Sequence, residues 1–267
     1  MNGVLGGILK DTWQEIEALR DTPPLTRRPH HTIDARSVLR RPKGARMRLI
    51  AEIKFRSPSA GALSTALGVR ERASAYVDAG ADMISVLVDR AHFGGSFDHL
   101  AEARAAVGTE VPLLCKGFIV DEIQLDAAQS GGADAALLIV RVLDEHPGAL
   151  SRLVSAARAR ALCPIVEVTN HDELRRALDA GAEVIGVNAR DLDTLVIDAN
   201  RAAAVLAEIP ASVVALAFSG VSSPEQVASL ARMAPRRVDA ALIGEALMRE
   251  DDPHNLLTAM TAATRGE

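Results

Sequence analysis

The chain has 267 residues, of which 48% are hydrophobic, and its formal net charge is −5. This composition can fill one large core, whereas the negative charge and the lack of a Lys/Arg-rich run exclude nucleic acid as a favoured partner. No stretch is apolar enough for a signal peptide or a membrane span, so we expect a cytoplasmic protein without membrane contact.

The first 47 residues contain no β-rich run. Residues 5–19 have the spacing of an amphipathic helix, and the prolines of DTPPL and RRP then break it into an extended connection. We predict that residues 1–47 form an N-terminal helical extension that packs on the rest of the molecule. Residues 48–267 are expected to complete one domain.

From residue 48 onward, short β-rich runs alternate with helical stretches rich in Ala, Leu, Arg and Glu. Several runs, such as MISVLV and AALLIV, are almost continuously apolar, which is typical of parallel strands covered by helices. The joints DAGAD, SGGAD and DAGAE place a glycine where a helix can end. The predicted strands are residues 48–54, 82–88, 111–116, 133–140, 163–168, 184–188, 212–217 and 238–244.

Eight β/α units predict a closed (β/α)8 TIM barrel of the α/β class. The alternative is a doubly wound open sheet. That fold should show a Gly-rich dinucleotide turn after its first strand, and AEIKFRSPSAG contains no GxGxxG. The barrel is therefore the favoured interpretation.

Polar residues stand at the carboxyl ends of the predicted strands, where the active site of such a barrel is built. Of the 30 Lys and Arg residues only four are lysines, and two of these stand at strand ends, which favours a chemical role that arginine cannot fill. Two Lys and two Glu facing one mouth can satisfy one another, either for a reaction or as an inert ion network. The set is Glu52, Lys54, Lys116, Glu167, Asn188 and Arg190, with Ser219-Gly220 and Gly244-Glu245 after the last two strands.

The two glycine-containing turns after the last strands predict a phosphate site, because barrels commonly bind phosphate there through backbone N–H groups. We expect no metal and no cofactor, because the seven histidines are scattered and His30-His31 has no acidic neighbour. Cys115 and Cys163 are interpreted as small buried residues on strands. No heptad seam indicates a dimer, so a monomer is expected.

At these residues the sequence resembles the indole-3-glycerol phosphate synthases, from about Leu49 to Arg249. The motifs stand in family order, and the helix before the first strand agrees with the extension that the family carries over its barrel. The resemblance implies ring closure of 1-(2-carboxyphenylamino)-1-deoxyribulose 5-phosphate, with loss of carbon dioxide and water, in tryptophan biosynthesis. The matching segments are AEIKFRSPSAG, DRAHFGGSFDHL, CKGFIVDEIQ, GADAALLIVRVL, PIVEVTNHDEL, GVNARDLDTLVID, SGVSSPEQV and ALIGEALMRE.

The resemblance also implies roles for single residues. Lys116 would be the general acid, Lys54 would hold the substrate carboxylate, and Glu167 would assist proton transfer in the dehydration. Glu52 would orient a lysine, and Asn188 would bond the sugar hydroxyls. Substrate-binding residues would be Arg190, a phosphate set of Ser57, Ser219, Gly220, Gly244 and Glu245, and an apolar bed of Phe93, Phe118, Leu137, Ile139 and Leu192.

Two positions depart from the family pattern. Lys116-Gly117-Phe118 stands where the family usually reads Lys-Asp-Phe, and Ala217-Phe218-Ser219-Gly220 stands where it reads Ser-Glu-Ser-Gly. With two carboxylates lost, we expect mutual repulsion and burial to lower the lysine pKa values. Two alternatives stay open: a diverged homologue acting on a related aryl-amino ketose phosphate, and a non-catalytic barrel that binds a phosphorylated ligand. A phosphoribosylanthranilate isomerase would be expected to use a Cys and Asp pair instead.

Overall fold

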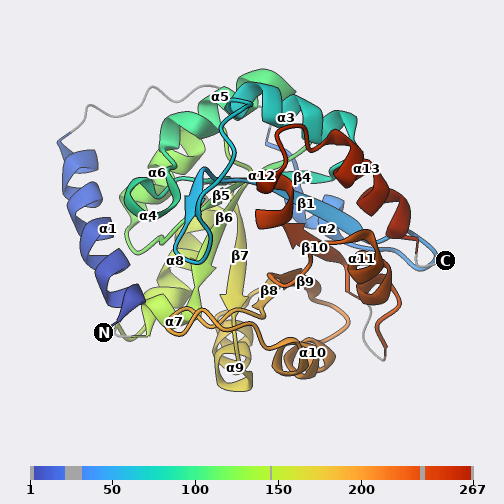
Figure 1. Ribbon diagram of the computed structural model, residues 1–267. Helices are drawn as coiled ribbons and strands as arrows, with labels where there is room; N and C mark the ends of the chain where they lie inside the picture. The colour runs from blue at the N-terminus through green and yellow to red at the C-terminus, as the bar shows by residue number, and fades with distance from the viewer. Residues whose placement is uncertain (1–2, 22–31, 145, 235–237, 266–267) are drawn as a thin grey trace.

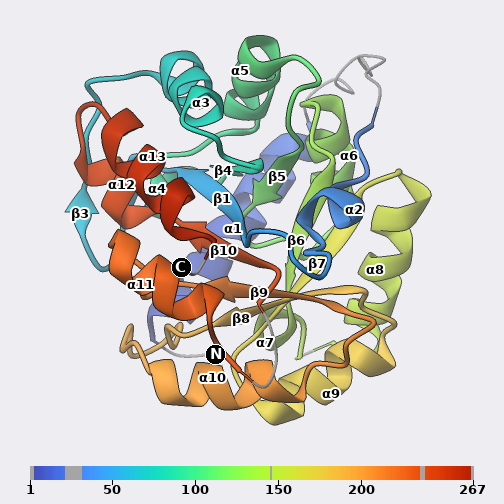
Figure 2. The ribbon, with the colours of Figure 1, turned by 90° about the vertical axis from the view of Figure 1, so that its right-hand side faces the viewer.

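The computed structural model describes residues 3–21, 32–144, 146–234 and 238–265. Eight parallel strands close into a barrel in the order β1-β10-β9-β8-β7-β6-β5-β4 (Figures 1 and 2), which confirms the predicted (β/α)8 architecture. The strands are β1 (Arg48–Ile53), β4 (Met83–Leu87), β5 (Leu113–Lys116), β6 (Ala135–Ile139), β7 (Cys163–Val168), β8 (Val184–Asn188), β9 (Val214–Phe218) and β10 (Ala240–Ile243).

The predicted strands lie within a few residues of the observed ones, and β9 differs in a way that affects the site. It begins at Val214 instead of residue 212 and runs one residue further than predicted, to Phe218. The reason is pairing on both sides, because Phe218 is in register with Asn188 of β8 and Leu242 of β10. Phe218 is therefore a strand residue of the barrel wall.

Helices surround the barrel on its outer face (Figure 2). Several begin at a side-chain cap that accepts a backbone N–H, such as Ser96, Asn170 and Ser223, and Asp121 forms a capping box with Gln124. The outer helices are α3 (Val69–Asp78), α5 (Phe97–Val107), α6 (Glu122–Ser130), α8 (Ala149–Ala159), α9 (His171–Asp179), α10 (Ala199–Glu208), α11 (Pro224–Ala231) and α13 (His254–Ala263), and shorter turns form α4 (Arg90–Phe93), α7 (Val140–Leu143) and α12 (Glu245–Arg249).

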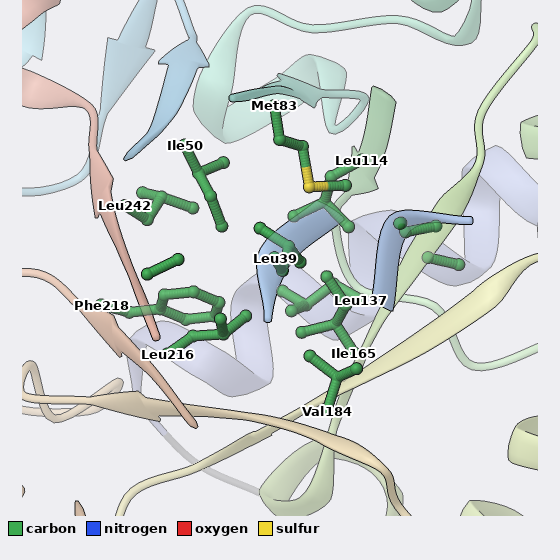
Figure 3. Packing of buried hydrophobic residues seen from close by; sticks show 14 of the residues in the cluster. Leu39, Ile50, Met83, Leu114, Leu137, Ile165, Val184, Leu216, Phe218 and Leu242 are labelled. Atoms are coloured by element: carbon green, nitrogen blue, oxygen red, sulfur yellow. The ribbon is translucent and has the colours of Figure 1, made fainter. Parts of the chain in front are cut away.

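The amino-terminal end of the barrel is closed by α2 (Ala35–Leu39). The aspartates that precede two strands accept backbone N–H groups of this segment, Ile33 to Asp134 and Arg41 to Asp239. Figure 3 shows Leu39 pointing toward the interior residues of the barrel. Chemistry is thus confined to the opposite end, where the strands finish.

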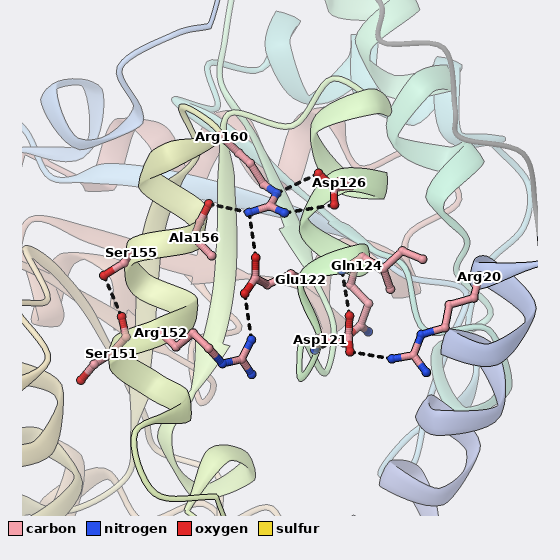
Figure 4. Close-up of polar contacts among 11 residues, drawn as sticks. Arg20, Asp121, Glu122, Gln124, Asp126, Ser151, Arg152, Ser155, Ala156 and Arg160 are labelled. Atoms are coloured by element: carbon pink, nitrogen blue, oxygen red, sulfur yellow. Dashed lines mark hydrogen bonds and ion pairs between the residues drawn. The ribbon is translucent and has the colours of Figure 1, made fainter.

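The N-terminal helix α1 (Val4–Arg20) confirms the predicted helix and packs against α6 and α4 (Figure 1). Arg20 of α1 bonds Asp121 at the start of α6 at 2.9 Å, as Figure 4 shows beside the ion pairs between α6 and α8. The proline-containing motifs after it lie largely in residues 22–31, outside the described residues.

The two cysteines differ in burial. Cys115 of β5 is buried as expected, but Cys163 is only partly buried, because it is the first residue of β7 at the rim of the sheet. Within the described ranges no three His, Cys, Asp or Glu side chains lie close enough to hold a metal ion, and every helix is too short or too polar to span a bilayer. His30-His31 lies outside these ranges.

Candidate active site

A cavity opens at the carboxyl ends of the strands, beneath the first turns of α1. It brings together the residues predicted for the site, except that Leu137 and Ile139 are buried in the barrel and do not line it. The predicted residues that line it are Glu52, Lys54, Ser57, Phe93, Lys116, Phe118, Glu167, Asn188, Arg190, Leu192, Ser219, Gly220, Gly244 and Glu245.

One carboxylate serves two lysines on one side of this cavity. Lys54 Nζ donates to Glu52 Oε1 at 2.6 Å, and Lys116 Nζ lies 3.1 Å from Glu52 Oε2. Burial alone would raise the pKa of Glu52, but the two ammonium groups outweigh it and lower the pKa to about 2. A Cβ at residue 244 would lie 2.3 Å from Glu52 Oε1, so only glycine at 244 lets this pair approach the start of α12.

The pKa of Lys116 differs from the prediction that repulsion and burial lower the pKa values of the two lysines. Burial alone would lower its pKa, but Glu52 and then Glu167 outweigh burial, and the pKa of Lys116 is raised. The prediction of a lowered value was wrong for this lysine, because it assumed that the remaining carboxylates compensate the two cations poorly. Lys116 is therefore a charged ammonium with protons to donate.

Glu167 and Asn188 form a hydrogen-bonded pair that faces the lysines in the same cavity. The Asn188 amide donates to Glu167 Oε1 at 3.0 Å, and its oxygen accepts the backbone N–H of Arg190 at 3.0 Å, which fixes the amide orientation. Burial raises the pKa of Glu167, and Lys116 and the Asn188 hydrogen bond offset only part of that rise. A carboxyl group with a raised pKa binds a proton more readily than a free one, which suits a group that takes up and returns protons.

Gly117 and Phe218, the two residues that depart from the family pattern, are both closely packed. The ring of Phe218 is 2% exposed and lies where a Cβ on Gly186 of β8 would stand, 2.3 Å from the nearest ring atom. A Cβ on Gly117 would lie 2.9 Å from Val88 Cγ2. In place of the two missing carboxylates the barrel has apolar packing, and Phe218 presents its ring to the cavity.

The turns after β9 and β10 supply backbone N–H groups at the rim. Ser219 and Gly220 both have positive φ values, 64° and 81°, and this conformation is uncommon for a non-glycine residue such as Ser219. The Glu245 side chain is bonded to Arg249 at 2.7 Å. Its backbone N–H at the start of α12 is therefore the group that could meet an anion.

Residues that the sequence interpretation missed complete the cavity. Val4, Leu5 and Ile8 of α1 line its outer side, and their apolar three- and four-residue spacing was the available signal. The other missed residues are Leu195, Val221 and Leu242, whereas Pro58 and Ser59, which also line the cavity, belong to the Ser57-Pro58-Ser59 segment that the sequence places after the first strand. Ser57 lies in β2 (Arg56–Ser57), which pairs with β3 (Gly61–Ala62) in a hairpin that was not predicted.

Comparison with known proteins decides the family. A sequence model described as indole-3-glycerol phosphate synthase matches residues 5–260. The chain belongs to the indole-3-glycerol phosphate synthase family. The synthase of that name from Kineococcus radiotolerans is 40% identical over 98% of this chain and 95% of its own length. The Streptomyces coelicolor indole-3-glycerol phosphate synthase 1 is 42% identical over 83% of this chain and 80% of its own length.

Solved structures agree on the fold of this indole-3-glycerol phosphate synthase family member. A 3-hexulose-6-phosphate synthase superposes with a TM-score of 0.62 at 18% identity, over 81% of this chain and 99% of the other. A thiamine phosphate pyrophosphorylase from Pyrococcus furiosus gives 0.61 at 14% identity, over 84% and 98%. At these identities the likeness concerns the barrel alone.

Proposed function

We propose that this chain closes the indole ring of indole-3-glycerol phosphate from 1-(2-carboxyphenylamino)-1-deoxyribulose 5-phosphate, releasing carbon dioxide and water. The observation that carries the proposal is the pairing of Lys54 and Lys116 with one buried carboxylate, in the same cavity as the bonded Glu167 and Asn188. Membership of the synthase family supports the same reaction.

Lys116 is the general acid in this proposal. As the aromatic carbon that bears the carboxylate attacks the ketone carbon, the ketone oxygen takes a proton from the Lys116 ammonium and becomes a hydroxyl group. Because the pKa of Lys116 is raised, this group is a charged ammonium at neutral pH when the substrate binds. Lys54 binds the substrate carboxylate until the bond to the ring breaks and carbon dioxide leaves, returning its electrons to the ring.

Glu167 acts in the dehydration that follows. The new hydroxyl group takes up a proton and leaves as water, the neighbouring methylene carbon loses a proton so that the double bond forms, and Glu167 assists this proton transfer. Asn188 holds Glu167 through one amide hydrogen, so its second amide hydrogen can reach a sugar hydroxyl. Glu52 contacts neither reacting atom and orients the two lysines.

Binding energy comes from the two ends of the substrate. The phosphate is held by Ser57 and by backbone groups of Ser219-Gly220 and Gly244-Glu245, with Arg190 beside them at the rim. The aromatic ring lies against Phe93, Phe118 and Leu192 in the cavity. Leu137 and Ile139, which were predicted for the same bed, are buried in the barrel and do not line the cavity.

The test is turnover of the substrate by purified protein, followed by indole fluorescence. Turnover that disappears in Lys116→Ala and persists in the exposed-lysine control Lys43→Ala supports the synthase. No turnover by folded protein would contradict it. Tight substrate binding without turnover would then favour the alternative that Phe218 and Gly117 redirect the site toward a related aryl-amino ketose phosphate.

We also propose that the protein acts in the cytoplasm as a monomer. Both cysteines are unpaired, as is usual in a reducing compartment. Among the described residues only four large apolar side chains are exposed, Val4, Trp13, Val196 and Ile197, which is too few for a large apolar interface. A molecular mass near 28.2 kDa in size-exclusion chromatography with light scattering supports the monomer, and twice that mass would contradict it.

A further inference from the structure

Two buried polar atoms beside the proposed acid lack a hydrogen-bond partner among the described residues. One is Glu52 Oε2, which has Lys116 as its charged neighbour but no hydrogen bond of good geometry. The other is the hydroxyl of Ser85, whose residue is 0% exposed. A buried hydroxyl without a partner is costly, so its presence in a barrel wall requires an explanation.

The register brings these two residues together. Ser85 of β4 is the direct partner of Glu52 on β1, and adjacent parallel strands are about 4.8 Å apart. Side chains of register partners leave the sheet on the same face, and Glu52 lines the cavity. On its other side Ser85 pairs with Leu114 of β5, two residues before Lys116. Ser85 thus lies beneath the ion pair of Glu52 and Lys116, inside the barrel.

We propose that Ser85 is a positioning residue that donates its hydroxyl hydrogen to Glu52 Oε2 when Lys116 turns to the substrate. The inference rests on the proposed function, because the turn of Lys116 is part of that reaction. A serine side chain has three staggered χ1 rotamers, and a change of rotamer moves its hydroxyl oxygen toward this acceptor without movement of the strand.

When Ser85 replaces Lys116 as the donor to Glu52 Oε2, the Glu52 carboxylate keeps a polar partner during the chemical step. Glu52 is 1% exposed, so a carboxylate oxygen that loses its cationic neighbour cannot turn to bulk water. Without a replacement donor, Glu52 would hold the Lys116 ammonium back from the ketone oxygen. With Ser85 in place, the ammonium can leave while Lys54 stays bonded to Glu52 Oε1.

The first test is a double-mutant cycle in urea unfolding, which needs no turnover. In the wild-type background Ser85→Ala is expected to leave stability unchanged or to raise it slightly, because the hydroxyl makes no hydrogen bond there. In the Lys116→Met background Glu52 Oε2 has lost its neighbour and Ser85 donates to it. The same Ser85→Ala change should then lower the folding equilibrium constant about tenfold.

The second test compares turnover of Ser85→Ala, Ser85→Thr and Ser85→Val. Thr and Val have nearly the same shape, so any crowding by the added methyl group affects both, and only Thr keeps the hydroxyl. We expect kcat to fall about tenfold in the Ala and Val variants with little change in KM, and Thr to retain at least threefold more kcat than Val.

The outcomes separate the two proposals. If the wild-type protein does not turn over the substrate, the proposed function fails. The unfolding cycle still tests whether Ser85 donates to Glu52 Oε2, because it needs no turnover. Additive effects in that cycle overturn the positioning role whatever the kinetics. In an active enzyme, equal kcat values for Ser85→Thr and Ser85→Val overturn it as well.

Discussion

The two sides of the barrel mouth are built on opposite principles. On the charged wall, formed by Glu52, Lys54 and Lys116 of the β1 and β5 side, one carboxylate compensates two ammonium groups. On the apolar wall, formed by Gly186 of β8 and Phe218 of β9, an aromatic ring lies on a glycine. The difference teaches that Lys116 keeps a raised pKa without a carboxylate from β9, because Glu52 and then Glu167 outweigh the effect of its burial.

That division also suits an anionic substrate. Glu52 carries one negative charge beside two ammonium groups, so the charged wall taken by itself has one positive charge in excess. A substrate carboxylate would complete the balance.

The largest effect is expected from Lys116→Met on the charged wall. Loss of a general acid typically costs 10² to 10⁴ in rate, so we expect kcat to fall about 10³-fold, measured as indole formation under substrate saturation. The matched control is Lys43→Met, which removes an exposed lysine. A Lys116→Met enzyme with more than a tenth of wild-type kcat would assign the acid to another group.

The substitution Glu52→Gln should destabilise the charged wall, because it removes the negative charge that pairs with both lysines. It leaves two mostly buried ammonium groups without their carboxylate, and we expect the free energy of unfolding to fall by about 3 kcal/mol at pH 7. The pKa of Glu52 is lowered in the folded state, so its stabilisation is complete above the unfolded value near 4.5. It is lost as pH falls from there toward about 2.

Urea unfolding at several pH values measures this dependence. The stability gap between wild type and Glu52→Gln should be widest above about pH 5 and should narrow steadily below it. The control Glu71→Gln removes an exposed carboxylate and should give a small gap at every pH. A gap that stays constant down to pH 3 would mean that Glu52 does not hold its charge against the two lysines.

On the apolar wall, Gly186→Ala should cost about 2 kcal/mol, because the added methyl group meets the Phe218 ring at 2.3 Å. Adding Phe218→Leu should remove much of that cost, although Phe218→Leu alone destabilises the barrel by about 1 kcal/mol. Thermal unfolding of the two single variants and the double variant measures the coupling. Strict additivity would show that the ring and the glycine do not form one packed unit.

Sequence patterns revealed most of this arrangement because it is local. Apolar runs marked the strands, and period-two alternation put Glu52 and Lys54 on one side of β1. The pKa of Lys116 and the packing of Phe218 depend on residues from other strands. Hydrophobic periodicity along the sequence does not show such contacts. The two-residue strands β2 and β3 are too short to carry a pattern, and Leu137 lies too deep in the barrel to reach the cavity.

The smallest effect is expected where α1 joins the walls. Asp11 Oδ2 lies 2.9 Å from His92 Nε2, with both side chains partly exposed, and such pairs are worth about 0.5 kcal/mol. Asp11→Asn should therefore barely change stability but raise KM about twofold, because Val4, Leu5 and Ile8 of the same helix line the cavity. Glu208→Gln breaks the comparable pair with His171 on the outside of the barrel and should leave KM unchanged. Equal KM values for the two variants would mean that the apolar face of α1 alone keeps this helix in place over the cavity.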